Sequence, residues 1–350
     1  MSQPPFFSVI IPVYNGGDQF QRSLAALPRS NFSNWELIVV DDGSTDGSAA
    51  VAARFGARLL QTAGRQGPAA ARNLGARLAT GTYLFFVDAD CELHPDALGR
   101  AARQFESEPD LAALFGAYDD SPAAPNFIAQ YKNLFHHYVH LHSDSEASTF
   151  WTGCGAIKRS VFLALGGFDV QRYRRPAIED IELGYRLKQA GGRIRLAKEV
   201  QVKHLKAWTL PGLLRSDILD RGMPWSQLMW RSRDFLSDLN LQTHNRVSVV
   251  ALYGLLLALL AGLFQPVALA AVLALIALLV WLNAGLYRFF YQKRGLVFTL
   301  RAIPLHWLYY FYNAISFGGG LWLYWQEQLN PARRPAPTAL IDGHDVDGRG

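Results

Sequence analysis

The chain has 350 residues, half of them hydrophobic, and its 34 basic and 29 acidic side chains give a net charge of +5. This length allows one sizeable domain and something beyond it. The charge is too mild and too scattered to indicate nucleic-acid binding, but it suits an anionic membrane face or a phosphate-bearing substrate. Two cysteines give no disulfide framework, and the N-terminus lacks the basic region of a signal peptide, so we expect a reducing compartment.

The first half of the chain alternates strands and helices. Residues 6–13 read as a first parallel strand, and a helix opens at Gly16. Residues 37–40 (LIVV) form a second apolar run, which ends in Asp41 and Asp42 before a glycine-rich turn. Ligands of open α/β sheets bind outside the carboxyl ends of such strands, so we expect both carboxylates at the rim of a site.

A second acidic strand end follows about forty residues later. Residues 82–87 (TYLFFV) are rich in strand formers and are followed by Asp88-Ala89-Asp90. Acids two positions apart on an extended backbone point to the same side. Their oxygen atoms suit Mg²⁺ or Mn²⁺, which also take ligands from substrate phosphates. The sequence therefore predicts a divalent-metal site at Asp90, helped by Asp88.

The remaining elements continue the α/β pattern. Residues 135–142 carry four histidines interleaved with aromatic and leucine residues, which favours an amphipathic helix over a zinc site. We expect helices at 48–56, 67–79, from 95, 159–165 and from 178, and strands at 58–61, 111–118, 150–157 and 193–202.

Five motifs occur in an order that resembles the family 2 glycosyltransferases with a GT-A fold. The resemblance covers roughly residues 6–210. The motifs are FSVIIPVYN at 7–15, VVDDGSTDG at 39–47, GPAAARN at 67–73, FVDAD at 86–90 and IEDIE at 178–182. The resemblance implies a GT-A catalytic domain, 1–207, with a Rossmann-like mixed α/β sheet and a nucleotide-diphosphate sugar as donor.

The same resemblance assigns residues to a donor site, a metal site and an acceptor site. For the donor it implies Pro12, Tyr14, Asn15, Asp41, Asp42, Arg72, Asp88 and Ala89, with Asp42 facing the base and Arg72 facing the diphosphate. For Mg²⁺ or Mn²⁺ it implies Asp90, Asp88 and His204. For the floor of the acceptor site it implies Trp151, Gly153 and Cys154.

The catalytic base is expected at the start of the helix from 178. Related enzymes keep their general base there, so Asp180 would take the proton of an acceptor hydroxyl, with Glu179 in support. The expected reaction is an inverting transfer to a glycan or lipid-linked glycan. A polyprenyl-phosphate glycosyltransferase is the alternative, although Gly16 replaces the acid that many of those relatives carry. A sugar nucleotidyltransferase and a membrane scaffold with an inactive transferase domain are further alternatives. No G-x-G-x-x-G follows the first strand, which excludes a dinucleotide dehydrogenase.

The C-terminal third has the composition of a membrane region. Residues 208–246 mix tryptophan, leucine and arginine, which is typical of an interfacial amphipathic segment, but they lack the Q-x-x-R-W motif of processive synthases. Residues 247–282 run for 36 positions without a charge, with basic residues at both ends. We expect two or three helices within 247–325, with 303–325 crossing or re-entering, and a disordered tail at 326–350. The positive-inside rule places the catalytic domain on the cytoplasmic side of a multi-pass inner-membrane protein.

Overall fold

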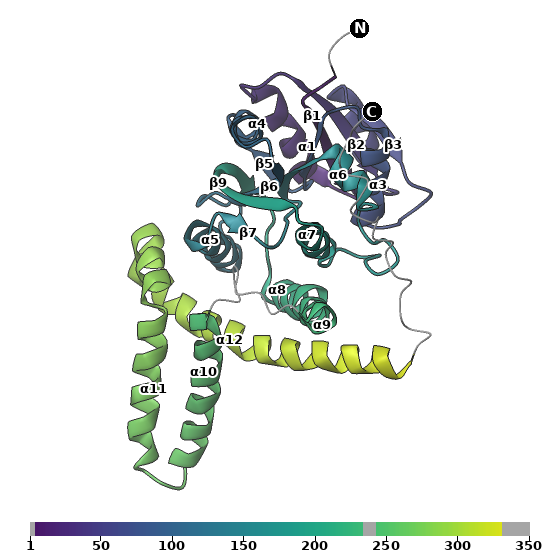
Figure 1. The fold of residues 1–350 in the computed structure, drawn as a ribbon. Helices are drawn as coiled ribbons and strands as arrows, with labels where there is room; N and C mark the ends of the chain where they lie inside the picture. Colours follow the sequence, from purple (N-terminus) through teal and green to yellow (C-terminus); the bar gives the residue numbers. More distant parts are fainter. Residues whose placement is uncertain (1–3, 234–242, 331–350) are drawn as a thin grey trace. The chain divides into compact units, whose positions relative to one another are not determined.

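The computed structural model describes residues 4–233 and 243–330 (Figure 1). The chain forms two compact units. The N-terminal unit contains Met1–Pro125 and Asp144–Ala207, and the C-terminal unit contains Asn126–Ser143 and Trp208–Pro331. The segment Asn126–Ser143 thus groups with the helices that follow residue 208, although it lies within the catalytic domain that the sequence suggests.

The N-terminal unit is built on one nine-stranded mixed sheet, in the order β3-β2-β1-β4-β8-β6-β9-β5, with β7 on β9. The strands are β1 (Phe7–Val13), β2 (Trp35–Asp41), β3 (Arg58–Gln61), β4 (Tyr83–Val87), β5 (Cys91–Leu93), β6 (Leu111–Tyr118), β7 (Glu146–Ala147), β8 (Cys154–Lys158) and β9 (Arg193–His204). The helices are α1 (Gly17–Ala26), a 3₁₀ turn (Leu27–Arg29), α2 (Ser48–Arg54), α3 (Pro68–Leu78), α4 (Ala97–Ser107), α6 (Arg159–Ala164) and α7 (Glu179–Gln189).

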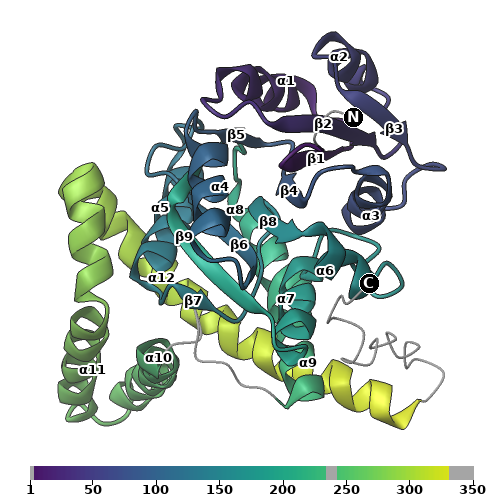
Figure 2. The same cartoon turned by 45° about the horizontal axis from the view of Figure 1, so that its top comes forward.

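Parallel pairing aligns the strand ends that matter for the site. β1 pairs in parallel with both β2 and β4, and β2 pairs in parallel with β3 (Figure 2). Every residue of β1 and β4 is buried, as expected for apolar runs covered on both faces. The carboxyl ends of β1, β2 and β4 therefore meet at one edge of the sheet. The mixed α/β sheet expected from the sequence is confirmed.

The main elements lie where the apolar periodicity placed them, with small differences. β3 matches its expected bounds, whereas α4 begins at Ala97 rather than at Pro95 because the amide of Ala97 closes a turn onto the carbonyl of His94. The short strands β5 and β7 were not expected. They are three and two residues long, too short to show a periodicity in the sequence.

The C-terminal unit is helical. Its elements are α5 (Phe127–His142), α8 (Leu210–Arg215), a π-helical segment (Ser216–Gly222), α9 (Met223–Ser232), α10 (Thr243–Gly262), α11 (Ala268–Leu282) and α12 (Ala284–Leu329). The helices α10 and α11 form an antiparallel hairpin (Figure 1). The expected span 303–325 is part of α12, which has a kink at Gly295. Residues 234–242 of the interfacial segment and 331–350 of the tail lie outside the described residues.

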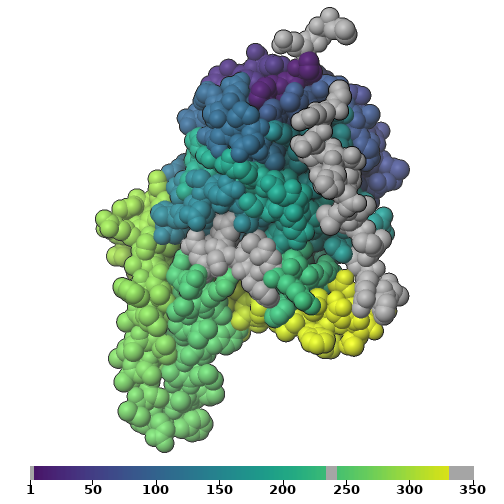
Figure 3. All heavy atoms as spheres, viewed as in Figure 1, coloured from purple at the N-terminus to yellow at the C-terminus, as the bar shows by residue number. Residues whose placement is uncertain are grey.

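The hairpin presents large apolar side chains on its surface. Leu257, Leu263 and Phe264 are 68%, 77% and 76% exposed, and no other described helix of this unit covers the far end of the hairpin (Figure 3). Among the described residues, α10 is long and apolar enough to cross a membrane, and the pair α11–α12, bent by 66°, adds one crossing if it forms a single span. The described residues thus contain one or two candidate spans, whereas the sequence led us to expect two or three. The multi-pass topology therefore stays a proposal.

Candidate active site

The carboxylate of Asp42, at the end of β2, folds the loop that follows β3. Asp42 Oδ1 accepts hydrogen bonds from Thr62 Oγ1 at 2.7 Å and from the Gln66 amide at 2.8 Å, and Oδ2 accepts one from the Gly67 amide at 2.7 Å. The side chain is 4% exposed. Three hydrogen bonds occupy most of the acceptor capacity of this carboxylate. Its expected contact with a nucleobase stays a prediction, and its visible role is to order residues 62–67.

The end of β1 is tied to the turn after β2. Asn15 adopts a φ of +51°, and its Oδ1 accepts a hydrogen bond from the Thr45 amide at 2.7 Å. Asp41 is buried and accepts a hydrogen bond from the Ser44 amide at 2.8 Å. These contacts fix two loops that meet at the sheet edge.

An exposed aromatic ring stands at this edge. Tyr14 is 41% exposed, and the guanidinium of Arg65 lies 4.1 Å from its ring centroid. Arg65 belongs to the loop that Asp42 orders, so the acid indirectly positions this cation. Pro12, by contrast, is buried within β1, where it pairs with Val40 of β2.

A buried arginine connects the end of β4 with the start of α7. Arg72, on α3, is 4% exposed. Its Nη2 donates to Asp88 Oδ1 at 2.7 Å, and its Nη1 donates to Glu179 Oε1 at 2.9 Å. Arg72 thus holds two of the expected site carboxylates together, while its expected contact with a diphosphate stays a prediction. Ala89, between the two acids, is half-buried.

The second acid of the β4 pair lies near a buried histidine. His204, the last residue of β9, pairs with Cys91 of β5, which directly follows Asp90. This pairing brings His204 Nε2 to 3.7 Å from Asp90 Oδ2. The imidazole stacks on Tyr118, with ring centroids 4.3 Å apart. Two strands that are distant in sequence therefore bring His204 beside Asp90.

The two acids that open α7 have different surroundings. Glu179 is buried, and its Oε2 accepts a hydrogen bond from the Ala177 amide at 2.9 Å in addition to the contact with Arg72. Asp180 is half-buried, and its Oδ2 accepts hydrogen bonds from the Thr152 amide at 3.1 Å and the Thr152 hydroxyl at 3.2 Å. Asp180 is therefore the more accessible of the two, and its carboxylate is oriented by Thr152.

The expected acceptor floor is a tightly packed segment. Trp151 is 7% exposed and lies edge-on against Tyr118, with ring centroids 4.8 Å apart. A Cβ at Gly153 would lie 2.3 Å from the Trp151 ring, so only glycine allows this approach. Cys154 is fully buried in β8, and burial raises the pKa of its thiol. Its side chain contributes packing beneath the segment.

The electrostatics of the acid cluster suit a bound cation. Burial raises the pKa of Asp88 against the charge of Arg72, and the neighbouring carboxylates of Asp90 and Asp180 raise it further. For Asp90, burial also raises the pKa, but the neighbouring imidazole of His204 and the charge of Lys206 prevail and lower it. No preformed group of three or more metal ligands occurs among the described residues. The acid pair thus fits a divalent ion that takes further ligands from a substrate diphosphate.

The structure adds residues that the motifs did not indicate. Thr62 and Thr152 each hold a site carboxylate, and neither stands out in the sequence. Glu182 pairs through Oε1 with Arg186 Nε at 2.7 Å, and Arg186 Nη2 donates to the carbonyl of Gly167. This buried clamp fixes α7 against the turn after α6. The sequence feature that could have indicated this ion pair is a carboxylate four residues before an arginine on a predicted helix.

Comparison with known proteins gives the sequence relationship. Residues 8–166 match the sequence model of Glycosyl transferase family 2. The chain is 43% identical over 93 residues to the uncharacterized glycosyltransferase YibD of Escherichia coli, which covers 25% of this chain and 27% of that protein. It is 40% identical over 103 residues to the glycosyltransferase AglE of Haloferax volcanii, covering 27% and 34%. The matched stretch spans about a quarter to a third of these relatives' length.

Comparison with solved structures gives the fold. The chain resembles the mannosyltransferase PcManGT from Pyrobaculum calidifontis, with a TM-score of 0.56 and 21% identity over 91% of this chain and 88% of that one. Together with the family match and the ordered motifs, this places a GT-A fold in the N-terminal unit. By sequence, residues 8–166 are similar to the family 2 glycosyltransferases, and the fold of the N-terminal unit agrees with that similarity.

Proposed function

We propose that the chain transfers a sugar from a nucleotide-diphosphate sugar to a hydroxyl group of a glycan or lipid-linked glycan, with inversion of the anomeric centre. The observation that carries this proposal is the bridge made by Arg72. It joins Asp88 at the end of β4 to Glu179, the neighbour of Asp180, through contacts of 2.7 and 2.9 Å. The acid pair proposed to hold a divalent ion and the candidate base would thus belong to one connected site.

The proposed chemistry is a single displacement. Asp180 accepts the proton of the acceptor hydroxyl, and the acceptor oxygen forms a bond to the anomeric carbon. The bond from that carbon to the diphosphate oxygen breaks, and the nucleoside diphosphate leaves with the electron pair. Thr152 keeps the Asp180 carboxylate oriented through two hydrogen bonds to Oδ2. Glu179 is held by Arg72 and acts as a positioning residue.

The donor would occupy the rim formed by β1, β2 and β4. Tyr14 offers an exposed ring for the base, next to Arg65. Asp90 and Asp88, with His204 alongside, would hold Mg²⁺ or Mn²⁺, which when bound offsets negative charge on the diphosphate. The solved mannosyltransferase of the same fold was determined in complex with GDP-Man and Mn²⁺.

A donor screen tests the proposal directly. The full chain, purified in detergent, is incubated with Mn²⁺ or Mg²⁺ and a panel of nucleotide sugars, and release of nucleoside diphosphate is measured. We expect release with one donor class that increases when a hydroxyl-bearing glycan acceptor is added. Transfer to polyprenyl phosphate alone would favour the runner-up, a polyprenyl-phosphate glycosyltransferase. No release with any donor would support the scaffold alternative.

We also propose that the C-terminal unit anchors the enzyme in the cytoplasmic membrane with the catalytic unit inside. The support is the apolar surface of the α10–α11 hairpin and the basic residues on either side of it, Arg246 before and Arg288, Lys293, Arg294 and Arg301 after. Protease added to sealed inside-out vesicles should cleave within residues 1–233, and protease added to intact cells should not. Cleavage of this region from outside intact cells would contradict the topology.

A further inference from the structure

The second half of α12 carries an exposed apolar face that takes no part in the proposed reaction. Residues 302–326 contain no Asp, Glu, Lys or Arg. Exposed residues recur there at intervals of three or four, which places them on one face of the helix. Three of the side chains on this face are more than half exposed, Trp322 at 63%, Trp325 at 55% and Leu329 at 80%. The members of the face, hereafter the α12 stripe, are Phe311, Ile315, Gly318, Trp322, Trp325 and Leu329.

Another face of the same helix is packed within the C-terminal unit. It lies against α9 and against the π-helical segment that precedes α9. A Cβ at Gly320 would lie 2.3 Å from the Cβ of Ser226, and a Cβ at Gly222 would lie 2.7 Å from the Cβ of Ser316. Small residues at both contacts therefore let the helices approach closely. The α12 stripe lies on a different side of the helix from these contacts.

Two ion pairs adjoin the packed face. Glu327, on α12, accepts a hydrogen bond at Oε2 from Arg231 Nε of α9 at 2.7 Å. The Tyr312 hydroxyl donates to Asp217 Oδ2 at 2.7 Å, and Asp217 Oδ1 accepts a hydrogen bond from Lys132 Nζ at 2.6 Å. If this half of α12 crossed the bilayer, the second pair would lie in the hydrocarbon, where ionisable side chains are costly. The packing therefore favours a helix that lies along the membrane surface.

Hydrogen bonds place α12 at the open end of the α10–α11 hairpin. The Tyr310 hydroxyl lies 2.9 Å from Asn245 Oδ1, in the first turn of α10, and 2.6 Å from Asn283 Oδ1, directly after α11. The loop of the hairpin, at Leu263 and Phe264, is at the opposite end. In Figure 1, the yellow half of α12 runs across the axis of the hairpin. A helix that runs across the open end of a membrane-crossing hairpin lies in the plane of the membrane.

We propose that the α12 stripe binds the lipid surface of the cytoplasmic leaflet, so that the second half of α12 lies in the membrane plane and does not cross it. The choice of lipid over a protein partner comes from composition and from the neighbouring hairpin. Tryptophan and phenylalanine beside leucine and isoleucine are typical of helices at the boundary between headgroups and acyl chains. Only Asn283 separates α12 from the apolar hairpin, so insertion of the hairpin brings the stripe to the same bilayer. The inference rests on the membrane anchor proposed above and does not depend on the chemistry of glycosyl transfer.

Depth-dependent fluorescence quenching tests this orientation. The full chain is reconstituted into vesicles of phosphatidylcholine and phosphatidylglycerol, and a bimane label is attached to Ile315→Cys, Trp322→Cys or Leu329→Cys. The two native cysteines are buried, and wild-type protein checks that they do not react. Phosphatidylcholine brominated near the headgroup end of its chains should quench all three labels equally, and more than lipid brominated near the chain ends. A crossing helix would separate Ile315 and Leu329 by about 20 Å in depth, and the resulting opposite preferences would overturn the proposal.

Two reference positions separate this inference from the anchor on which it rests. Leu257 is exposed on α10 of the hairpin, and Ser107 is exposed at the end of α4 in the N-terminal unit. We expect a label on Leu257→Cys to be quenched and a label on Ser107→Cys not to be quenched. Quenching of Leu257→Cys without quenching of the stripe would mean that something other than lipid covers the stripe, and it would overturn this inference alone. Loss of quenching at both places would overturn the proposed anchor as well.

A charge in the stripe should weaken its contact with lipid. Trp322→Glu, combined with the label on Leu329→Cys, should lower the quenching by about twofold or more, because a carboxylate disfavours burial among acyl chains. Gln328→Glu adds the same charge at an exposed position outside the stripe and is the matched control, with little change expected. Because Trp322 is exposed, the fold should tolerate the substitution, and thermal unfolding checks this. Wild-type quenching in the Trp322→Glu protein would contradict the proposal.

Discussion

Two strand ends of the sheet carry acid pairs that look alike in sequence and differ in the structure. At the end of β2, the Asp42 carboxylate accepts three hydrogen bonds from the chain itself, two of them from backbone amides. At the end of β4, Asp88 meets one arginine, and Asp90 lies 3.7 Å from a histidine. The first carboxylate orders a loop, whereas the second pair makes fewer hydrogen bonds to the backbone and is the pair proposed to hold a divalent ion.

The difference shows how burial and hydrogen-bond supply decide the role of an acid. Around Asp42, the hydrogen-bond donors are two backbone amides and a hydroxyl group of the loop that follows β3. Around Asp88, the nearby carboxylates of Asp90 and Asp180 oppose ionisation and raise its pKa together with burial. Such crowding of like charges is typical of functional sites. The comparison therefore predicts that mutation of the β4 acids mainly lowers the transfer rate, whereas mutation of Asp42 mainly lowers the stability of the fold.

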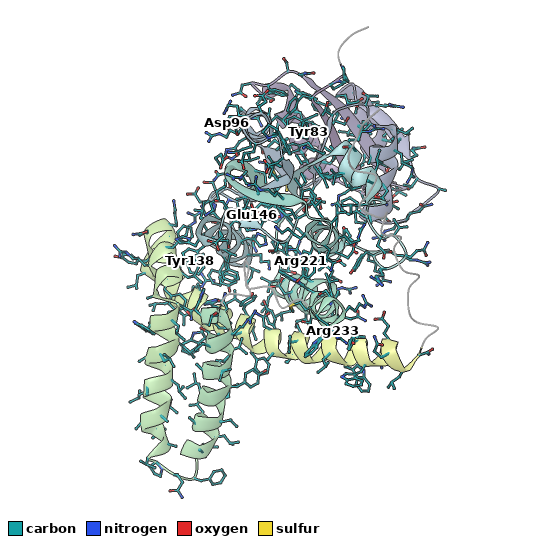
Figure 4. The ribbon with its side chains drawn as sticks, viewed as in Figure 1. Tyr83, Asp96, Tyr138, Glu146, Arg221 and Arg233 are labelled. Atoms are coloured by element: carbon teal, nitrogen blue, oxygen red, sulfur yellow. The ribbon has the colours of Figure 1, made fainter. Side chains whose placement is uncertain are left out.

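The largest effect is expected at Asp90. Asp90→Ala removes the carboxylate proposed to hold the divalent ion and should lower the transfer rate by about 10³-fold or more. His204 lowers the pKa of Asp90, so this carboxylate also contributes to stability, and thermal unfolding of the variant separates that loss from the loss of rate. Initial rates with saturating donor and metal measure the effect. Asp96→Ala, at a half-buried acid that pairs with Arg100 directly before α4, is the control (Figure 4). An active Asp90→Ala enzyme, or wild-type turnover in excess chelator, would contradict the proposal that Asp90 holds a divalent ion needed for transfer.

A smaller effect, on stability rather than chemistry, is expected at Asp42. Asp42→Asn keeps the shape but weakens acceptance from the Thr62 hydroxyl and the Gln66 and Gly67 amides. We expect the free energy of unfolding to fall by about 2–3 kcal/mol, as for lost hydrogen bonds to a charged group. Thermal unfolding in detergent measures this, and Asp90→Ala, which loses no backbone hydrogen bond from another loop, should show a smaller loss. Wild-type stability combined with weaker nucleotide binding would instead support a base-reading role for Asp42.

Much of the fold follows from the sequence because the central strands are continuous apolar runs. β1, β2 and β4 each end in a motif, and parallel pairing brings those ends together. The motif order therefore predicted which residues meet. The strand at the edge of the sheet could not be predicted in this way. β5 is only three residues long, and its position depends on pairing with the end of β9. No local pattern in three residues could indicate that contact.

The sequence predicted the acids of the site, but it did not predict the residues that form hydrogen bonds and ion pairs with them. Asp88, Asp90, Glu179 and Asp180 stand out as acids at element ends. Their hydrogen-bond partners come from distant positions, such as Thr152 for Asp180, 28 residues away. Likewise, the sequence indicated a cation in α3 but not that Arg72 would be buried between two carboxylates. Such pairings depend on tertiary packing, which cannot be predicted from local sequence propensity.

The most direct test of the account is the role of Asp180. Asp180→Asn keeps the hydrogen bonds with Thr152 possible while removing the proton acceptor, and Glu179→Gln serves as the neighbouring comparison. Donor affinity and transfer rate are measured in the same preparation. For Asp180→Asn, we predict unchanged donor affinity and a transfer rate about 10²–10⁴-fold lower. Transfer by Asp180→Asn at close to the wild-type rate would contradict the assignment of Asp180 as the base for a hydroxyl acceptor.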